Sequence, residues 1–380
     1  MDAPLKGLKV VELARILAGP WIGQVLADLG AEVIKVEAPA GDDTRRWGPP
    51  FLERERGDGT IETVAAYFHS ANRGKTSVTC DFTVPQDLTR LKALIAQADV
   101  VIENFKVGGL VKYGLDYASV SRDNPGLIYC SVTGFGPDGP RAREPGYDFM
   151  IQGMSGIMDL TGAPDGPPQK VGVAWIDVFT GLHGVIGIQA ALAARHTTGL
   201  GQKVDVSLME TGVGMLANQA MNQLLGGVTP TRMGNSHPNL VPYQAFETQG
   251  GHIIIATGND RQFNALCDVL GLETEAKEAR FADNAGRVKH RDEICGAIEA
   301  ATRTWDREAL LAALLAANIP AGPINTVAQA LDDPQIAARN MVIEPEGIKG
   351  LRTPISLSNA PSASPRAAPL LGAGQWQFDP

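Results

Sequence analysis

The sequence predicts an α/β fold, with a large domain built on a parallel sheet and a smaller α+β domain after it. Along the first half, short apolar strands alternate with helical segments, the pattern of strands joined by helical crossovers. At residues 226–230 the composition shifts to Gly-Gly-Val-Thr-Pro, which marks a domain junction. We therefore expect a large domain over residues 1–225 and a small domain over residues 226–325.

The first unit of the sheet is predicted from residues 8–37. An apolar strand at 8–13 is broken by Ala18-Gly19-Pro20, a helical pattern follows at 21–29, and a second strand closes at Glu37. This β-α-β order implies parallel strands and a right-handed crossover, as in Rossmann-like folds. Glu37 stands where dinucleotide folds place a ribose-binding acid. Because the preceding loop lacks G-x-G-x-x-G, a nicotinamide or flavin enzyme is only a weak alternative.

Further elements follow in the same alternation. A long surface loop is expected at 38–63. In the large domain, strands are predicted at 77–82, 100–102, 127–132 and 171–176, with a strand at 204–208 after a long helix and another helix at 87–98. In the remainder, the pattern predicts a hairpin at 246–257, helices within 261–317 and 328–340, and strands within 342–357, with the last residues expected to wander over the surface.

Composition excludes several function classes. The chain has 380 residues, 44% hydrophobic and 20% charged, which is typical of a globular protein. Its net charge of -9 argues against general nucleic-acid binding. Four scattered cysteines and six histidines without ligand spacing predict neither disulfides nor a metal site. No signal peptide or run of membrane-spanning length is recognised, so we expect a reducing, cytoplasmic location and no membrane partner.

The stretch 171–210 organises the chain. Its apolar start is predicted to be a strand that ends at Asp177, where a helix begins. A helix N-terminus favours the ionised form of a carboxylate, so Asp177 is expected to be ionised. Position alone favours a capping role for this aspartate. Gly181, Gly184 and Gly187 share one helix face, where a second backbone could approach, and Gly199 is a plausible left-handed cap.

Two other clusters are candidate ligand contacts. Arg73 and Lys75 flank a glycine turn before a strand, an arrangement that suits phosphate, although solvated surface charge is the commoner explanation. Asn104 and Phe105 follow a strand at its carboxyl end, where open α/β sheets bind ligands. Phe105 could support a purine ring or pack in the core.

Taken together, these segments resemble the family III CoA-transferases, a group that includes formyl-CoA, carnitine and succinyl-CoA-dependent transferases and α-methylacyl-CoA racemase. The resemblance spans nearly the whole chain in the family's order. Its matching segments are residues 8–20, 30–37, 72–75, 103–105, 146–148, 171–210, 241–246 and 319–323.

The resemblance implies that Asp177 is the catalytic nucleophile, which forms an anhydride and then an aspartyl-CoA thioester. Coenzyme A and its acyl thioesters are then substrates, and no cofactor is permanently bound. The resemblance also suggests that Lys75 and Lys112 contact the CoA phosphates and Phe105 the adenine. The positions that match the family's CoA-binding segments are Leu17, Ala18, Arg73, Lys75, Asn104, Phe105, Lys106, Lys112, Gly146 and Tyr147.

The same resemblance narrows the reaction. Racemases of the family have a histidine where this chain has Tyr147, and an ordinary tyrosine, with a pKa of about 10, is a poor proton carrier at neutral pH. Leu17 and Ala38 replace residues of the formyl-CoA enzyme, which argues against formate or oxalate. An α-methylacyl-CoA epimerase and a non-catalytic acyl-CoA-binding relative are the alternatives.

The acceptor is expected to be a small carboxylic acid. The segment 234–246 lacks the family's tetraglycine run and looks most like the succinyl-CoA:dicarboxylate branch, of the glutarate type. Asn235, Ser236 and His237 could then hold the distal carboxylate of a dicarboxylic acid, or form a plain surface loop. The family also implies an interlocked homodimer, in which residues 326–380 return to the large domain.

Overall fold

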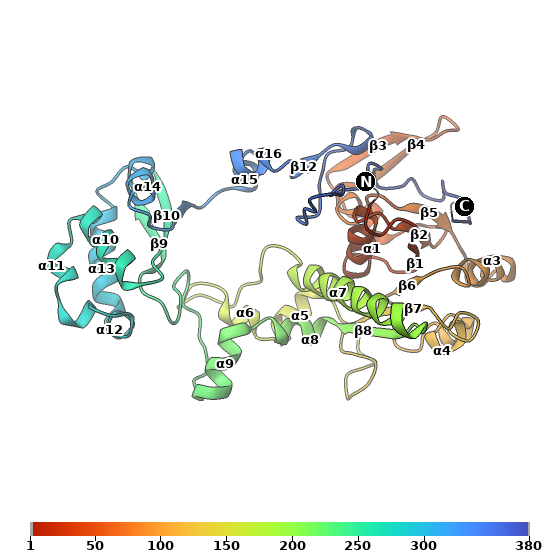
Figure 1. Ribbon diagram of the computed structural model, residues 1–380, viewed down its shortest axis with the longest axis horizontal. Helices are drawn as coiled ribbons and strands as arrows, with labels where there is room; N and C mark the ends of the chain where they lie inside the picture. Colours follow the sequence, from red (N-terminus) through yellow and green to blue (C-terminus); the bar gives the residue numbers. More distant parts are fainter. Residues whose placement is uncertain (1–2, 379–380) are drawn as a thin grey trace. The chain divides into compact units, whose positions relative to one another are not determined.

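The computed structural model describes residues 3–378 and divides into two compact units. The first unit contains the described parts of Met1–Met158, Lys170–Val228 and Pro334–Pro380. The second contains Asp159–Gln169 and Thr229–Asp333 (Figure 1). The short segment 159–169, which the sequence does not set apart, belongs to the second unit.

A six-stranded parallel sheet forms the centre of the first unit. The strand order is β5-β2-β1-β6-β7-β8, so the chain moves outward from β1 in one direction and from β6 in the other. This order confirms the predicted β-α-β unit and the parallel sheet. The strands are β1 (Lys9–Glu12), β2 (Glu32–Glu37), β5 (Thr76–Thr79), β6 (Val100–Glu103), β7 (Ile128–Thr133) and β8 (Lys203–Ser207).

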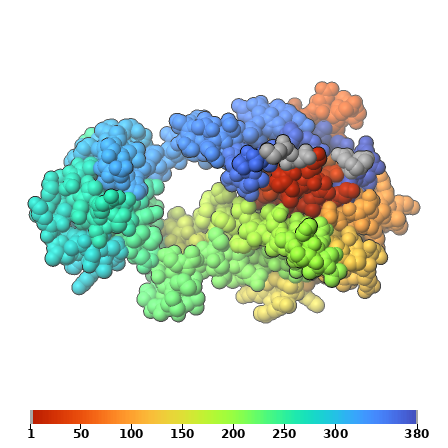
Figure 2. Space-filling view, in the orientation of Figure 1, coloured from red at the N-terminus to blue at the C-terminus, as the bar shows by residue number. Residues whose placement is uncertain are grey.

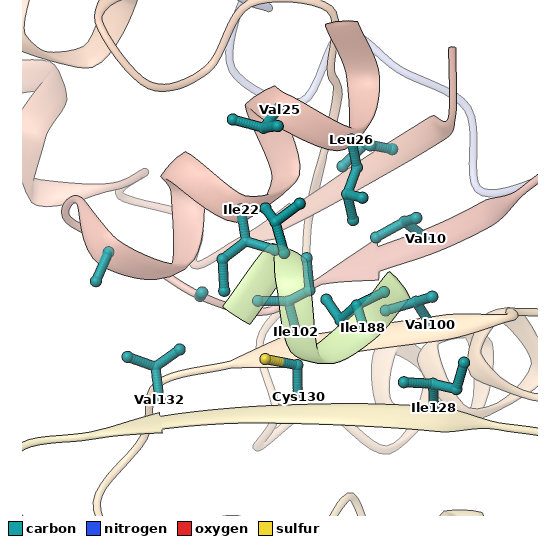
Figure 3. Close-up of a cluster of buried hydrophobic side chains, with 14 of the residues drawn as sticks. Val10, Ile22, Val25, Leu26, Val100, Ile102, Ile128, Cys130, Val132 and Ile188 are labelled. Atoms are coloured by element: carbon teal, nitrogen blue, oxygen red, sulfur yellow. The ribbon is translucent and has the colours of Figure 1, made fainter. Parts of the chain in front are cut away.

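Helices cover both faces of this sheet, which explains why its strands are apolar throughout. On one face, helices α1 (Ala18–Asp28) and α7 (Trp175–Thr198) pack on alternate strand residues, among them Val10 and Ile102. Figure 3 shows Ile22 of α1 and Ile188 of α7 meeting over this layer. The opposite face is covered by α3 (Pro85–Ile95), α4 (Tyr117–Val120) and the last described residues.

Helix α7 begins earlier than the sequence pattern predicts. Residues 171–174 form no strand, so the predicted strand at 171–176 is wrong, and Asp177 lies in the first turn of the helix. The glycine interpretation is confirmed. A Cβ on Gly181 would lie 2.8 Å from the Ala18 carbonyl oxygen, and one on Gly184 would lie 2.4 Å from Ile22. Gly199 ends the helix with a φ of 71°.

Helix α7 also has the length and apolarity of a membrane span, so the prediction that no segment does is wrong. Its 24 residues meet that test by length and composition only. Its buried residues, such as Ile176 and Ile188, pack within the core of the first unit. Such packing is typical of a core helix, which passes the same test.

The segment predicted as a loop at 38–63 contains an antiparallel hairpin, β3 (Phe51–Glu55) and β4 (Ile61–Ala65). The other elements outside residues 229–333 are short. They are η1 (Asp43–Arg46), α2 (Ala66–His69), η2 (Val111–Tyr113), α5 (Asp148–Met154), α6 (Ile157–Leu160), α8 (Leu208–Gly214), α9 (Ala217–Gly226), α16 (Pro334–Ala338), β12 (Val342–Ile343), η4 (Pro345–Gly347) and β13 (Gly350–Leu351).

Residues 351–378, the C-terminal strap, run back along the first unit rather than wandering over its surface. The Gly374 N–H donates to the Ser77 carbonyl at 2.7 Å, so the strap covers the edge strand β5. Trp376 and Phe378 pack against the core on the α3 face. Figure 2 shows the blue C-terminal part of the chain beside the red N-terminal part.

The second unit has its own core under a three-stranded sheet of order β11-β10-β9. The predicted hairpin is confirmed, with its turn at Gly250 and Gly251. Its elements are β9 (Tyr243–Thr248), β10 (Gly251–Ala256), α10 (Asp260–Leu270), α11 (Glu273–Ala276), η3 (Ala279–Phe281), α12 (Asn284–Lys289), α13 (Arg291–Thr302), α14 (Arg307–Ala316), β11 (Ala321–Pro323) and α15 (Val327–Leu331).

Candidate active site

A pocket of about 400 Å³ lies at the carboxyl ends of the central strands of the first unit. Because the strand order reverses between β1 and β6, the loops after these strands separate and leave a crevice. Residues 15–18, after β1, form one wall, and residues 104–107, after β6, form another. Residues 142–147 and Asp177 form further parts of the lining.

Asp177 is brought to this pocket by the first turn of α7, but it does not cap the helix. The cap is Asp148, whose Oδ2 accepts the N–H of Ile176 at 2.9 Å and the N–H of Asp177 at 3.2 Å. Asp148 is itself held by Gln152, whose Nε2 donates to its Oδ1 at 2.6 Å. The helix N-terminus therefore stabilises Asp148 and leaves the Asp177 side chain to the pocket.

This arrangement reverses the electrostatic prediction for Asp177. Burial, with the neighbouring Asp148 carboxylate adding like-charge repulsion, raises the pKa of Asp177 to about 7. The sequence predicts a helix terminus that favours the ionised form. This prediction is wrong because burial, together with the nearby Asp148 carboxylate, favours the protonated form of Asp177. A carboxylate in such a site is weakly solvated, which makes it more reactive toward an electrophile when it is ionised.

The wall formed by residues 15–18 presents backbone donors. Leu17 precedes α1, and Ala18 is its first residue. The N–H groups of these two residues have no acceptor among residues 3–378, as expected for the first turn of a helix. Both residues line the pocket with Asp177. They could therefore hydrogen-bond a carbonyl or carboxylate oxygen that enters the pocket.

Asn104 secures this wall from the side of β6. Its Oδ1 accepts the Arg15 N–H at 3.0 Å, and its Nδ2 donates to the Arg15 carbonyl at 2.7 Å. Phe105 is half-buried, stacks near Phe82 at 5.8 Å between ring centroids, and lines the pocket. It therefore serves the core and the pocket together, so the two interpretations of this residue are compatible.

A second cavity of about 270 Å³ shares Phe105 and Lys106 with the first. Tyr117 and Tyr129 form part of its lining. The exposed Lys106 thus borders both cavities. The two cavities together provide a concave surface on the first unit that is larger than either pocket alone.

Gly146 and Tyr147, which the resemblance implies as CoA contacts, both line the pocket. A Cβ on Gly146 would lie 2.4 Å from the Gly134 Cα, so the two glycines let the ends of the loop 134–146 cross in contact. Tyr147 is 65% exposed and precedes α5.

The sequence pattern overlooked Arg15 and Arg143, two exposed cations that also line the pocket. In the sequence, Arg15 is marked only by its place in the loop after a predicted strand, and Arg143 only by its place in a Gly- and Pro-rich loop.

The structure does not bring Arg73 and Lys75 to either cavity. Lys75 is fully buried, with its Nζ 2.8 Å from Glu12 Oε2, and burial lowers its pKa to about 7 despite this partner. Arg73 is buried against Asp28, at 2.5 Å. Their predicted phosphate contacts would require these pairs to break. Glu37 is likewise occupied, since it accepts both Nε and Nη2 of Arg45.

The other predicted contacts lie elsewhere. Lys112 is exposed, stands 4.7 Å over the Tyr113 ring, and lines neither cavity. Ser236 and His237 belong to the second unit, where Ser236 donates to Gln244 at 2.8 Å. The Nδ1 of His237 accepts the Asn239 and Leu240 N–H groups, and burial lowers its pKa. Asn235 is exposed in the same turn.

Comparison with known proteins identifies the family. The model of CoA-transferase family III matches residues 5–375. The chain belongs to CoA-transferase family III. It is therefore an enzyme, as the sequence resemblance predicted.

Two relatives and one solved structure describe this similarity. The chain is 49% identical over 380 residues to succinate–glutarate CoA-transferase of Agrobacterium fabrum, covering 98% of this chain and 94% of that one. It is 37% identical to succinyl-CoA:mesaconate CoA-transferase of Haloarcula hispanica, covering 97% and 93%. A CAIB/BAIF family protein from Brucella suis has 56% identity and a TM-score of 0.88, with 98% and 97% covered. This match bears out the α/β family III fold.

Proposed function

We propose that this CoA-transferase moves CoA from succinyl-CoA to a small dicarboxylic acid, with Asp177 as the covalent nucleophile. One observation carries the proposal: Asp177 is a partly buried carboxylate with a raised pKa that opens onto a pocket lined by backbone donors. Perturbed carboxylates in clefts are typical of catalytic groups. The names of the two relatives, which act on glutarate and mesaconate, support a dicarboxylate acceptor.

The proposed reaction has four exchanges at carbonyl carbons. An Asp177 oxygen attacks the donor thioester, the C–S bond breaks, and CoA leaves as a thiolate from a mixed anhydride. The thiolate then attacks the aspartyl carbonyl, which releases the donor acid as its carboxylate and leaves an aspartyl-CoA thioester. The acceptor carboxylate displaces the thiolate from this thioester to form a second anhydride. The thiolate finally attacks the acceptor's acyl carbon, and the Asp177 carboxylate is regenerated.

Across these four exchanges no proton is gained or lost overall, so the site needs oxyanion donors rather than a general acid. The free N–H groups of Leu17 and Ala18 are suited to that task because each exchange builds negative charge on a carbonyl oxygen. The exposed cations Arg15, Lys106 and Arg143 at the pocket would attract the phosphates of CoA. The partly enclosed pocket would limit hydrolysis of the intermediates by water.

Racemisation is the second candidate, and the lining of the pocket argues against it. No histidine is among the residues that line the pocket in the described chain. Tyr147 occupies the position of the racemases' histidine. A racemase would incorporate solvent deuterium at the α-carbon of an α-methylacyl-CoA without any acceptor acid, whereas a transferase would not.

We also propose that the enzyme works as an interlocked homodimer in a reducing, cytoplasmic compartment. Helix α9 and the residues after it leave large apolar side chains exposed, with Leu224 at 72%, Leu225 at 84% and Val228 at 64%. Exposed apolar patches of this kind mark protein contacts. The cysteines are all free and buried, which suits a reducing compartment. Under this proposal Asn235, Ser236 and His237 select the acceptor.

The deciding experiment is mass spectrometry of the protein quenched after incubation with succinyl-CoA. We expect an adduct on the peptide that contains Asp177, and its discharge when a dicarboxylic acid of four to six carbons is added. Asp177→Asn should remove the adduct and lower transfer by about 10³-fold or more while the protein still folds. A wild-type protein that forms no adduct with any acyl-CoA donor would rule out the covalent mechanism.

A further inference from the structure

A strained residue stands in the wall of the pocket. Ile16 has a φ of 73°, in the left-handed region that β-branched residues strongly avoid. Of the non-glycine residues with positive φ in the described chain, it alone is β-branched; the others are Ala217, Asn318, Asn340 and Glu346. Such a conformation persists only where the surroundings impose it.

Two side chains impose it here. The Asp42 carboxylate accepts the Ile16 N–H, at 3.2 Å from Oδ2. On the other side, Asn104 brackets the main chain of Arg15 with two hydrogen bonds. The peptide between Arg15 and Ile16 is therefore fixed at both of its ends. The residues that follow, Leu17 and Ala18, line the pocket, and neither N–H group has an acceptor among residues 3–378.

Asp42 is itself held rigidly. Its side chain is buried, its Oδ2 lies 3.0 Å from the Lys35 ammonium, and its Oδ1 accepts the N–H and hydroxyl of Thr44. Burial would raise its pKa, but Lys35 and Thr44 together hold the pKa below the usual value. Lys35 is anchored in turn by Glu12 at 3.0 Å. A fixed, ionised carboxylate thus faces the strained residue.

We infer that Asp42 is a positioning residue, which fixes the backbone donors of Leu17 and Ala18 against Asp177 by holding Ile16 in its left-handed conformation. The inference rests on the proposed transfer through Asp177. Glycine is the ordinary residue for positive φ, but it would leave this loop free to sample several conformations. Isoleucine held by Asp42 gives the loop one conformation and gives the pocket an apolar wall.

The test compares Asp42→Ala, Ile16→Gly and the double variant. If Asp42 acts by holding Ile16, glycine should relieve the need for it, because glycine adopts positive φ without strain. Asn318→Gly, which relieves another positive φ in the second unit, is the matched control. Asp42→Asn, which removes the charge but keeps the side-chain volume and an acceptor oxygen, separates loss of the ion pair with Lys35 from loss of the hydrogen bond to Ile16.

The readouts are the rate of adduct formation at Asp177 with saturating succinyl-CoA, the KM for the donor, and hydrogen exchange of residues 14–18. In Asp42→Ala we expect adduct formation to slow by about 10- to 100-fold, with a change in KM under about threefold, since donors are displaced rather than lost. Exchange at Ile16 should become faster. The rate of adduct formation in the double variant should recover to within about threefold of the rate in Ile16→Gly. Asn318→Gly added to Asp42→Ala should not restore the rate.

Three results would overturn the inference: a wild-type rate in Asp42→Ala, a double variant as slow as Asp42→Ala, or unchanged exchange at Ile16. A role confined to overall stability would lower the melting temperature without rescue of the rate by glycine. Failure of the proposed function is seen separately, as an absence of adduct in the wild-type protein. The exchange measurement still tests the clamp on Ile16 in that case.

Discussion

At the scale of residues, the site depends on two aspartates with divided roles. Asp148 takes the N–H groups at the start of α7, and Asp177 is left partly buried beside it. This division explains how one helix terminus can be satisfied while a neighbouring carboxylate has a raised pKa. Removing the charge of Asp148 should therefore change the chemistry of Asp177 without removing the cap.

Adduct formation should increase with pH, with a midpoint near the Asp177 pKa of about 7, because only the ionised carboxylate attacks. In Asp148→Asn the midpoint should move to lower pH, since the like charge is gone while asparagine still caps the helix. The measurement is the single-turnover rate with succinyl-CoA between pH 5 and pH 9. The exposed Asp123→Asn serves as the control and should leave the midpoint unchanged.

The raised pKa of Asp177 also makes the stability of the folded protein depend on pH. Since the folded protein holds the Asp177 proton more tightly than the unfolded chain does, its contribution is full below the unfolded pKa and is lost as pH rises through about 7. In Asp177→Asn this part of the pH dependence should vanish from thermal unfolding.

A pH–rate midpoint that does not move in Asp148→Asn would contradict the assigned electrostatics.

Individual residues of the site were predictable from sequence, but their electrostatics were not. Asp177, Leu17, Asn104 and Tyr147 do meet at one pocket. The cap of α7 comes from Asp148, 28 residues before Ile176, and nothing local in the sequence reveals it. Lys75 resembled a phosphate ligand only because its buried partner, Glu12, is 63 residues away.

At the scale of elements, the contact between α1 and α7 sets the positions of Ala18 and Asp177, which both line the site. Gly181 lets the two helices approach, since a Cβ there would meet the Ala18 carbonyl oxygen at 2.8 Å and the Trp21 Cβ at 3.0 Å. Ala18 lines the pocket and begins α1, so any separation of the helices reaches the site directly.

Gly181→Ala should destabilise the protein by about 1–3 kcal/mol through overpacking, and it should slow transfer as well. Gly296→Ala is the matched control, because a Cβ at that position in α13 meets nothing within 4 Å. It should stabilise the second unit by about 0.5–1 kcal/mol, as expected for glycine in a helix interior. Chemical denaturation measures both, and equal effects of the two changes would refute the packing argument.

Most elements followed from periodicity, and the exceptions have physical causes. Strand β7 and helix α3 lie close to their predicted positions because one face or both faces of each are buried. Residues 171–174 are largely apolar but form no strand. Gln152 binds the Val171 N–H instead, and Asp148 accepts the N–H groups of Ile176 and Asp177, where the helix starts. The hairpin β3–β4 was overlooked because its strands are largely exposed and charged.

At the scale of the whole molecule, Asp28 joins segments that are far apart in sequence. Its carboxylate accepts Arg73 and also the N–H groups of Thr353 and Ser364, at 3.2 and 3.0 Å. The strap is thereby tied to helix α1. The sequence could not predict this attachment, because the strap is rich in Pro, Ala and Ser and has no periodic pattern.

Asp28→Ala should lower the free energy of unfolding by about 3 kcal/mol, since it leaves a buried arginine without its partner. Cleavage of residues 353–371 under limited proteolysis should become faster. Glu346→Gln is the control, because this half-exposed glutamate binds the same strap through the Ala367 N–H. Its cost should stay below about 1 kcal/mol. Equal protease sensitivity of the two variants would show that Asp28 does not hold the strap.

The strap has a consequence for the order in which the chain is made. Its residues complete the edge of a sheet whose strand β5 ends at Thr79, and about 290 residues of synthesis separate the two. At translation speeds of roughly 5–20 residues per second, β5 would wait on the order of 15 seconds or more for its cover. During that interval a bare strand edge is open to pairing with other nascent chains. Slow synthesis of the second unit would therefore favour aggregation of the first.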